Sequence, residues 1–281
     1  MPWLLSSDLG HRSWSPSERQ CERTAFSFYI AVRDRLPVWT LEDLRRMEVL
    51  CWDGGCPRPF LPSEALLYAL IHDHQDYARY LLGRYSIGAL NEPHCSFRCC
   101  RGGGSSLLTT AVRYERVSIL GMMMDALKEC GAQGERRRFL DGHSGCSHAA
   151  DAGKTPVQVA VQLSRPECLR LLLVHGARPE GLDSALERLF TSDVSERRSA
   201  QRCLDLLLLF VPKLLTQHSL QEEPKRWQSL LGNEVFNWLC GLTPPPLLLQ
   251  ALRCLAQTGP QQIATLPDFL IFRFPLYMRR T

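Results

Sequence analysis

The sequence predicts an all-α fold in which short helix pairs stack into a solenoid. A helix–turn–helix pattern recurs with a small alanine at the same place in its first helix, at Ala69, Ala111 and Ala160. Each alanine is followed, at a constant distance, by an apolar pair and then by an apolar triplet in the second helix. Because such units do not bury their apolar faces alone, neighbouring copies must stack.

Composition and charge limit the class of protein. The chain has 281 residues, of which 45 % are apolar and 22 % charged, values typical of a globular protein with an ample core. A net charge of +4 is too small to indicate nucleic-acid binding. The twelve cysteines are irregularly spaced and the N-terminus does not resemble a secretory signal. We therefore expect a cytoplasmic protein without transmembrane segments, whose cysteines are thiols.

The N-terminal part is predicted to end in a helical cap. Residues 1–20 are polar and are expected to be mobile, and residues 21–60 form the cap. A first helix carries Phe28 and Val32 at helical spacing and is closed by Pro37. Thr40 and Asp43 resemble a capping box, which predicts that a second helix begins at Thr40.

The repeats are predicted over residues 61–215. In the clearest copy, "GKTPVQVAVQLSRPECLRLLLVHGARP", Pro156 opens the first helix and Gly176 ends the second as a left-handed C-cap. The alanines are 42 and 49 residues apart, which predicts long loops at 91–104 and 131–150. A fourth unit combines "LDSALERLF" and "SAQRCLDLLLLFV", joined by a lengthened polar loop through Asp193 and Arg198.

Residues 216–281 are predicted to form a helical tail. Trp227 and Trp238 have amphipathic spacing and are expected to be core. After three prolines, Leu247, Ala251 and Leu255 are spaced i, i+4, i+8 and form one helical stripe. This helix either caps the last repeat or offers its stripe to the groove of a partner.

Two segments resemble known families. The run from "GKTPVQVA" to "LLLVHGA" resembles the ankyrin repeat, although Gln158 replaces the usual histidine and the spacings exceed roughly 33 residues. The tail is similar to the box with which suppressor-of-cytokine-signalling (SOCS) boxes bind elongin. The matching positions are Pro246, Leu247, Ala251 and Leu255. The following "TLPDFLIFRF" resembles the cullin-contacting element of such boxes through Leu266, Pro267 and Leu270, but lacks the fuller Leu-Pro-apolar-Pro form.

Together these features resemble the ankyrin-repeat SOCS-box class, and the likeness runs from about residue 20 to the end. It is strongest in "AFSFYIAVRDRLPVW", "PSEALLYALIHDHQDYARYLL", "SFRCC" and "RPECLRLLLVHGA". The resemblance implies a non-catalytic substrate receptor of a cullin–RING ubiquitin ligase, promoting ubiquitination and proteasomal degradation. Elongin B/C and a cullin would bind the tail. The implied substrate, inosine monophosphate dehydrogenase, would bind the repeats.

The concave face of an ankyrin array predicts where a substrate binds. The positions that follow each small alanine at the end of the first helix are Ile71, His72, Arg113, Tyr114, Gln162 and Leu163. Tyrosine and arginine are common interface hot spots, so Arg113 and Tyr114 are the central expectation. Two alternatives remain open: an ankyrin scaffold without a ligase role, and a metal- or redox-responsive vesicle protein.

The sequence assigns no catalytic residue, cofactor or metal ligand. Gly153-Lys154-Thr155 lacks the preceding glycine of a phosphate loop, because position 148 is histidine. Thiols and imidazoles gather in the two loops, where free thiols are favoured over a zinc or copper(I) site. These residues are His94, Cys95, Cys99, Cys100, His143, Cys146 and His148. His72 and His74 are expected to be solvated turn residues.

Overall fold

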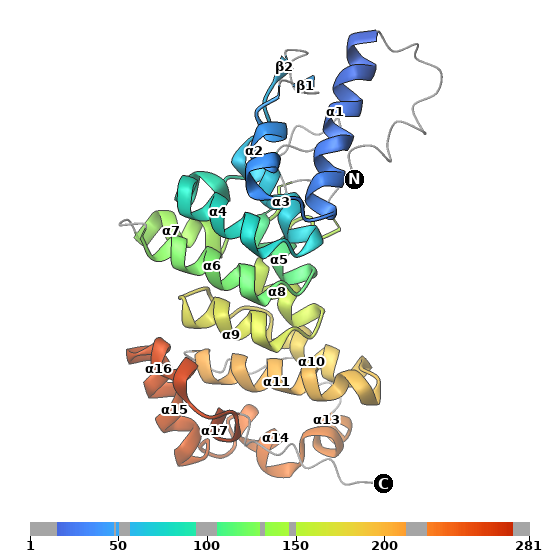
Figure 1. Ribbon diagram of the computed structural model, residues 1–281. Coiled ribbons are helices and arrows are strands. Elements are labelled where there is room, and N and C mark those ends of the chain that lie inside the picture. The colour runs from blue at the N-terminus through green and yellow to red at the C-terminus, as the bar shows by residue number, and fades with distance from the viewer. Residues whose placement is uncertain are drawn as a thin grey trace. The chain divides into compact units, whose positions relative to one another are not determined.

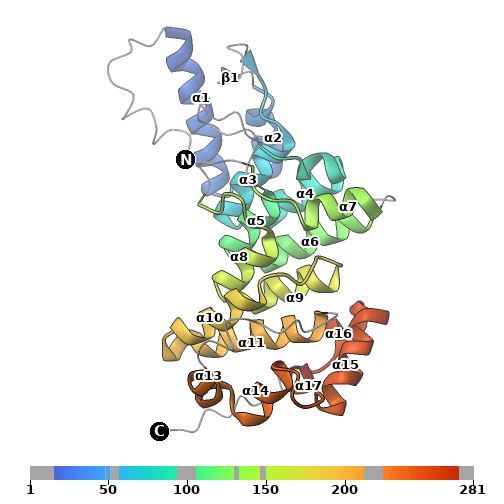
Figure 2. The ribbon, with the colours of Figure 1, turned by 180° about the vertical axis from the view of Figure 1, so that it is seen from behind.

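Helices dominate this computed structural model, which confirms the predicted all-α class (Figures 1 and 2). It describes residues 16–47, 49–50, 57–93, 106–129, 133–145, 150–211 and 224–271. The strands in these ranges are β1 (Val49–Leu50) and β2 (Pro57–Arg58), which pair antiparallel. The chain forms two compact units, Met1–Thr155 and Pro156–Thr281.

The first unit is built from helix pairs that stack in register. Its helices are α1 (Pro16–Arg33), α2 (Val38–Arg45), α3 (Pro62–His72), α4 (Gln75–Tyr85), the 3-10 helix η1 (Ser86–Leu90), α5 (Leu107–Arg113), α6 (Val117–Lys128) and α7 (Gln133–Leu140). The first helices of successive pairs pack together, α1 on α3 and α3 on α5. The second helices do the same, α2 on α4 and α4 on α6. This is the stacking that the repeat register predicts.

The second unit continues the pattern and then changes to a helical tail. Its helices are α8 (Pro156–Gln162), α9 (Pro166–Val174), α10 (Leu182–Thr191), α11 (Val194–Phe210), α13 (Pro224–Leu231), α14 (Asn233–Leu239), α15 (Leu247–Thr258), α16 (Pro260–Thr265) and α17 (Asp268–Ile271). Here α8 packs on α10 and α9 on α11. In the tail, α15 packs on α11 and α16 on α9. Trp227 and Trp238 are buried, as expected.

The small alanines lie where the first helix must approach its neighbours. Ala69, Ala111 and Ala160 are all fully buried, because a larger side chain would push the packed helices apart. The apolar pairs that follow, Tyr77-Ala78, Ile119-Leu120 and Cys168-Leu169, are also fully buried. In each triplet the last two side chains are buried and the first is half-buried. The predicted register is therefore confirmed.

A shared turn closes the first helix of each repeat. The fourth residue after each alanine is left-handed, with φ of 53°, 54° and 53° at Asp73, Glu115 and Ser164. The next backbone N–H donates to the carbonyl of the alanine, at 2.9, 2.9 and 2.8 Å. The same turn follows Ala31, where Arg35 has φ 55° and the Leu36 N–H donates to the Ala31 carbonyl at 3.0 Å. Helices α1 and α2 therefore form a further repeat-like unit.

Gly176 ends α9 as predicted. Its φ is 93°, a conformation that costs a glycine little. The Ala177 N–H donates to the Leu172 carbonyl and the Gly176 N–H to the Leu173 carbonyl, both at 3.0 Å. These two bonds are the Schellman pattern, which satisfies carbonyls that the helix leaves without partners.

Three local predictions are wrong. Helix α2 begins at Val38, because Pro37 has an extended ψ of 145° and is itself the N-cap, so Thr40 lies inside the first turn. The polar residues after Asp193 are the exposed start of α11 rather than a loop, and Arg188 of α10 pairs with Glu196 there. The expected loop at 131–150 contains α7. In the last two cases polar residues on an exposed helix surface resemble a loop sequence.

Candidate protein-binding surfaces

Helix α15 packs with one face and exposes the other. Leu249, Leu252 and Ala256 are 6 % exposed or less and form the face that packs on the unit. The opposite face carries the predicted stripe: Leu247 is 83 % exposed, Ala251 is exposed and Leu255 is half-buried. The helix therefore serves as a packed element and still leaves a leucine at its start in solvent.

Hydrogen bonds hold the start and the middle of this helix. Pro246 is its N-cap, and the Gln250 side chain donates to the Pro245 carbonyl at 2.6 Å. The Arg253 guanidinium donates to the Val211 carbonyl at 2.5 Å, just after α11. Burial lowers the pKa of Arg253. The exposed stripe is thus held on a helix whose orientation is set by its other contacts.

The predicted cullin-contact residues lie between α16 and α17. Leu266 is half-buried, with an extended backbone of φ −71° and ψ 142°, and Pro267 is exposed. Leu270 lies in α17, but its side chain is outside the described residues. The segment follows α15 after the short helix α16, so both predicted tail contacts lie in the C-terminal part of the second unit.

The histidines of the first turn are not solvated, which corrects that expectation. His74 is 5 % exposed, and its Nδ1 accepts the Tyr77 N–H at 3.3 Å, so it caps α4. His72 is half-buried, and its ring meets the Tyr29 ring edge-on with centroids 4.8 Å apart. Burial lowers the pKa of His72, and the nearby Arg33 and Arg116 lower it further. His74 is buried and His72 half-buried because the neighbouring repeat covers their turn.

Arg116 connects successive turns. Its guanidinium donates to the carbonyls of Leu70 and Ile71, both at 2.9 Å. These carbonyls lie in the last turn of α3, where a helix runs out of backbone donors; the Asp73 N–H also donates to the Leu70 carbonyl, at 3.4 Å. The predicted Ile71 position is half-buried. The Ile71 carbonyl, by accepting from Arg116, therefore helps to join two neighbouring repeats.

Arg113 and Tyr114 have different surroundings. The Arg113 guanidinium makes two hydrogen bonds to the Asp151 carboxylate, both 2.5 Å long, and the hydrogen bond to Asp151 raises the pKa of Arg113. Tyr114 is 42 % exposed, with the Arg116 guanidinium 6.0 Å from its ring centroid. Tyr114 presents its side chain to solvent, whereas Arg113 fastens the segment before α8. In the second unit, Gln162 is exposed and Leu163 is half-buried.

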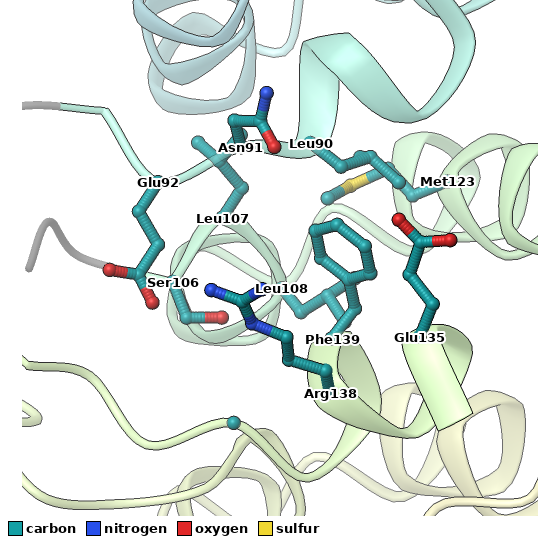
Figure 3. A pocket seen from close by; sticks show the side chains of 11 residues that line it. Leu90, Asn91, Glu92, Ser106, Leu107, Leu108, Met123, Glu135, Arg138 and Phe139 are labelled. Carbon is teal, nitrogen blue, oxygen red and sulfur yellow. The ribbon is translucent and has the colours of Figure 1, made fainter.

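A pocket of about 190 Å³ lies in the first unit beside α7 (Figure 3). Its floor is apolar, made by the buried Leu107, Leu108 and Met123. Figure 3 shows the Phe139 ring beside this floor, with Glu92, Glu135 and Arg138 around it. Sequence reasoning missed the pocket because it treated 131–150 as a loop. The available signal was Phe139-Leu140 after the polar run of α7.

A mouse protein identifies the family. The chain is 39 % identical over 277 aligned positions to "Ankyrin repeat domain-containing protein 9" of Mus musculus, covering 86 % of this chain and 84 % of the mouse protein. The chain belongs to the ankyrin repeat domain-containing protein 9 family. No family model matches it, and no solved structure gives a significant match. Membership in this family confirms the ankyrin-repeat fold class and a role in protein interaction.

The predicted thiol and imidazole clusters of this family member lie largely outside the described residues. His94, Cys95, Cys99, Cys100, Cys146 and His148 are all outside them. His143 is described, and its Nδ1 lies 3.0 Å from the Gly153 carbonyl. Across the described ranges, no three histidine, cysteine or carboxylate side chains form a metal-sized group. Within the same ranges, no helix has the length and apolarity needed to cross a membrane.

Proposed function

We propose that this ankyrin-repeat protein is a non-catalytic substrate receptor of a cullin–RING ubiquitin ligase. Its repeats bind the substrate protein, which by resemblance is inosine monophosphate dehydrogenase. Its tail binds elongin B/C through α15 and a cullin through the segment that follows. The observation that carries the proposal is Leu247, which is 83 % exposed at the start of a helix whose opposite face is packed.

The geometry of α15 suits helix-in-groove recognition. Burying an exposed leucine in a partner pocket contributes about 1.5–3 kcal/mol. Ala251, one turn along the same exposed stripe, is small enough to let a partner approach the helix backbone. Because the buried face already orders the helix, binding does not require α15 to fold. The receptor would then act by proximity, since tethering makes ubiquitin transfer effectively intramolecular.

The Leu247→Ala variant tests the elongin contact. We expect elongin B/C binding to weaken at least about tenfold, because a buried interface leucine is worth ~2 kcal/mol or more. The melting temperature should not change, because the side chain is exposed in the free protein. Val194→Ala is the matched control, since Val194 is 85 % exposed at the start of α11.

Two results would contradict this assignment. Elongin B/C that co-purifies equally with Leu247→Ala places the contact elsewhere. A wild-type protein that never binds elongin, with a variant of sharply lower melting temperature, makes α15 a capping helix only. The protein is then an ankyrin-repeat scaffold without a ligase role, the second function that its family membership supports.

Tyr114→Ala tests the substrate surface. We expect substrate affinity to fall about tenfold while elongin binding stays intact, because exposed tyrosines are frequent hot spots. Arg113 is left unchanged, since removing it would also leave the buried Asp151 without its ion pair. Phe26→Ala is the control, because Phe26 is a comparably exposed aromatic residue of the same unit. Unchanged affinity in Tyr114→Ala, with a loss in Phe139→Ala, would move the site to the pocket beside α7.

A further inference from the structure

Two arginines reach from the repeats of the second unit to the segment that follows α15. Arg170 of α9 pairs with the Asp268 carboxylate at 3.2 Å, and its Nη2 donates to the carbonyls of Ile263 and Ala264. Arg202 of α11 pairs with the other oxygen of Asp268 at 3.2 Å and with Glu167 at 2.7 Å. These residues form a network of two positive and two negative charges.

Among the contacts of Arg170, the one with the carbonyl of the buried Ile263 is partly buried, whereas those with Ala264 and Asp268 are exposed. Ile263 and Ala264 lie in the last turn of α16, where a helix runs out of N–H donors; the Leu266 N–H still donates to the Ile263 carbonyl, at 3.3 Å. A guanidinium at this position supplies donors and lies at the negative end of the helix dipole. The Arg170 side chain is 16 % exposed, whereas Asp268 is 61 % exposed. The ion pair alone is therefore expected to contribute little, and the caps more.

We propose that Arg170 is a positioning residue that holds α16 and the adjoining Leu266-Pro267 on α9, with Arg202 supporting it through Asp268. The effect on cullin binding rests on the proposed function. Leu266 and Pro267 lie directly between the capped end of α16 and Asp268, so both of their neighbours are held. Arg170 thus sets where the predicted cullin contact lies relative to α9 and α11.

We expect that a lysine at position 170 would not reproduce the contacts of Arg170. The guanidinium donates in two directions at once, toward a carboxylate and toward two carbonyls, from a planar group. An ammonium keeps the charge but lacks this fork. The buried Ile263 keeps an apolar anchor under α16 in every variant, so the expected change is local opening rather than unfolding.

Hydrogen exchange of the full chain bound to elongin B/C tests the proposal, together with the affinity of that complex for a cullin. In Arg170→Ala, amides of residues 260–271 should exchange about tenfold faster or more, because charge-assisted bonds that oppose opening are lost. Arg170→Lys should resemble Arg170→Ala, and Asp268→Asn should show a smaller change. Arg198→Ala, an exposed arginine of α11, should match the wild type.

The readouts separate this inference from the proposed function. If amide exchange at residues 260–271 is unchanged in Arg170→Ala, Arg170 does not hold α16 on α9. Faster exchange with an unchanged cullin affinity overturns the positioning role, whereas the proposal expects a severalfold weaker cullin affinity with undiminished elongin binding. If the wild-type chain binds no elongin, the proposed function fails. Amide exchange of the free chain then still decides whether Arg170 holds α16 on α9.

Discussion

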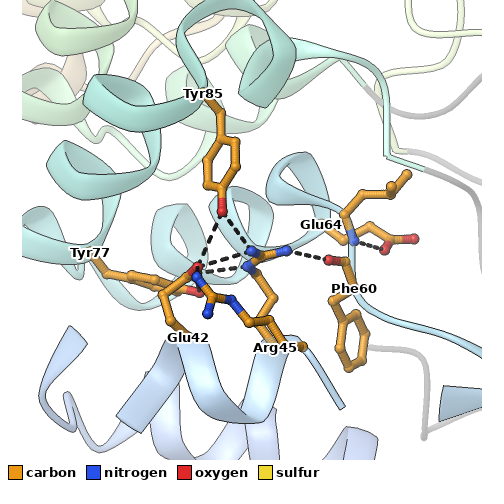
Figure 4. Close-up of polar contacts among 8 residues, drawn as sticks. Glu42, Arg45, Phe60, Glu64, Tyr77 and Tyr85 are labelled. Atoms are coloured by element: carbon orange, nitrogen blue, oxygen red, sulfur yellow. Dashed lines mark hydrogen bonds and ion pairs between the residues drawn. The ribbon is translucent and has the colours of Figure 1, made fainter. Parts of the chain in front are cut away.

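Replacing Arg45 by methionine is expected to lower the free energy of unfolding by about 3–5 kcal/mol, because it leaves the buried Glu42 carboxylate without its cation. Glu42 and Arg45 are 4 % and 7 % exposed and pair through two bonds of 2.7 and 2.9 Å. Arg45 also donates to the Phe60 carbonyl at 2.8 Å and to the Tyr85 hydroxyl at 2.7 Å (Figure 4). The Tyr77 hydroxyl donates to Glu42 at 3.0 Å.

The network also makes stability depend on pH. Burial alone would raise the pKa of Glu42, but the hydrogen bonds and charge of Arg45, with the Tyr77 and Tyr85 hydroxyls, hold it below its ordinary value. A lowered pKa means that the carboxylate stabilises the fold above the pKa of the unfolded chain, about 4.3. This contribution is lost as the pH falls through the folded-state pKa.

Urea denaturation at pH 7 and at acid pH measures both effects. Arg46→Met is the control on the same helix, because Arg46 is 57 % exposed and lies 3.9 Å from the same carboxylate. An exposed pair contributes about 0–1 kcal/mol, so this variant should remain close to the wild type. If Arg45→Met and Arg46→Met lower the free energy of unfolding equally, the buried pair contributes no more to stability than the exposed one.

Asp205→Asn is expected to stabilise the protein by about 1–3 kcal/mol at neutral pH, because it removes an ionisable group that burial penalises. Asp205 is 1 % exposed within α11, and its Oδ2 has no hydrogen-bond partner. Burial raises the pKa of Asp205 well above its ordinary value, and Arg202 offsets this only in part. Asparagine has nearly the same shape and stays neutral.

The sign of the pH effect makes this prediction specific. Because the pKa of Asp205 is raised in the folded protein, the protonated side chain does not destabilise the fold below the unfolded-state pKa, about 3.9. Stability is lost as the pH rises from there through the folded-state pKa of Asp205. The advantage of Asp205→Asn should therefore shrink as the pH is lowered, in parallel thermal denaturations of both proteins. Asp43→Asn, which replaces an exposed aspartate of α2, is the matched control. A variant less stable than the wild type at every pH would contradict the argument.

The repeat register was predictable because it depends on local spacing. Ala111 and the pair Ile119-Leu120 are buried for the reason that their pattern indicates, namely the close packing of neighbouring helices. The unit around Ala31 was not recognised as a repeat. There Trp39 takes the position of the buried pair and is 71 % exposed, whereas Leu41 is buried two residues later. The backbone turn after Ala31 is the same as in the other repeats, but the apolar residues that follow it are shifted along the sequence, so the pattern does not reveal the repeat.

Local sequence also predicted a stripe at Leu247 and Ala251, because helical periodicity places these residues on one face. Spacing does not show which face of α15 packs on α11, since both faces carry leucines; burial of Leu249 and Leu252 decides it.

The pairing of charged residues was the feature that depended most on the tertiary structure. Arg113 meets Asp151, 38 residues away, and Arg170 meets Asp268, 98 residues away. No pattern within a helix relates residues so distant, because their pairing depends on how the helices stack. The chain's local spacing therefore places its helices and apolar faces, and only the stacked helices determine which exposed side chains remain for a partner.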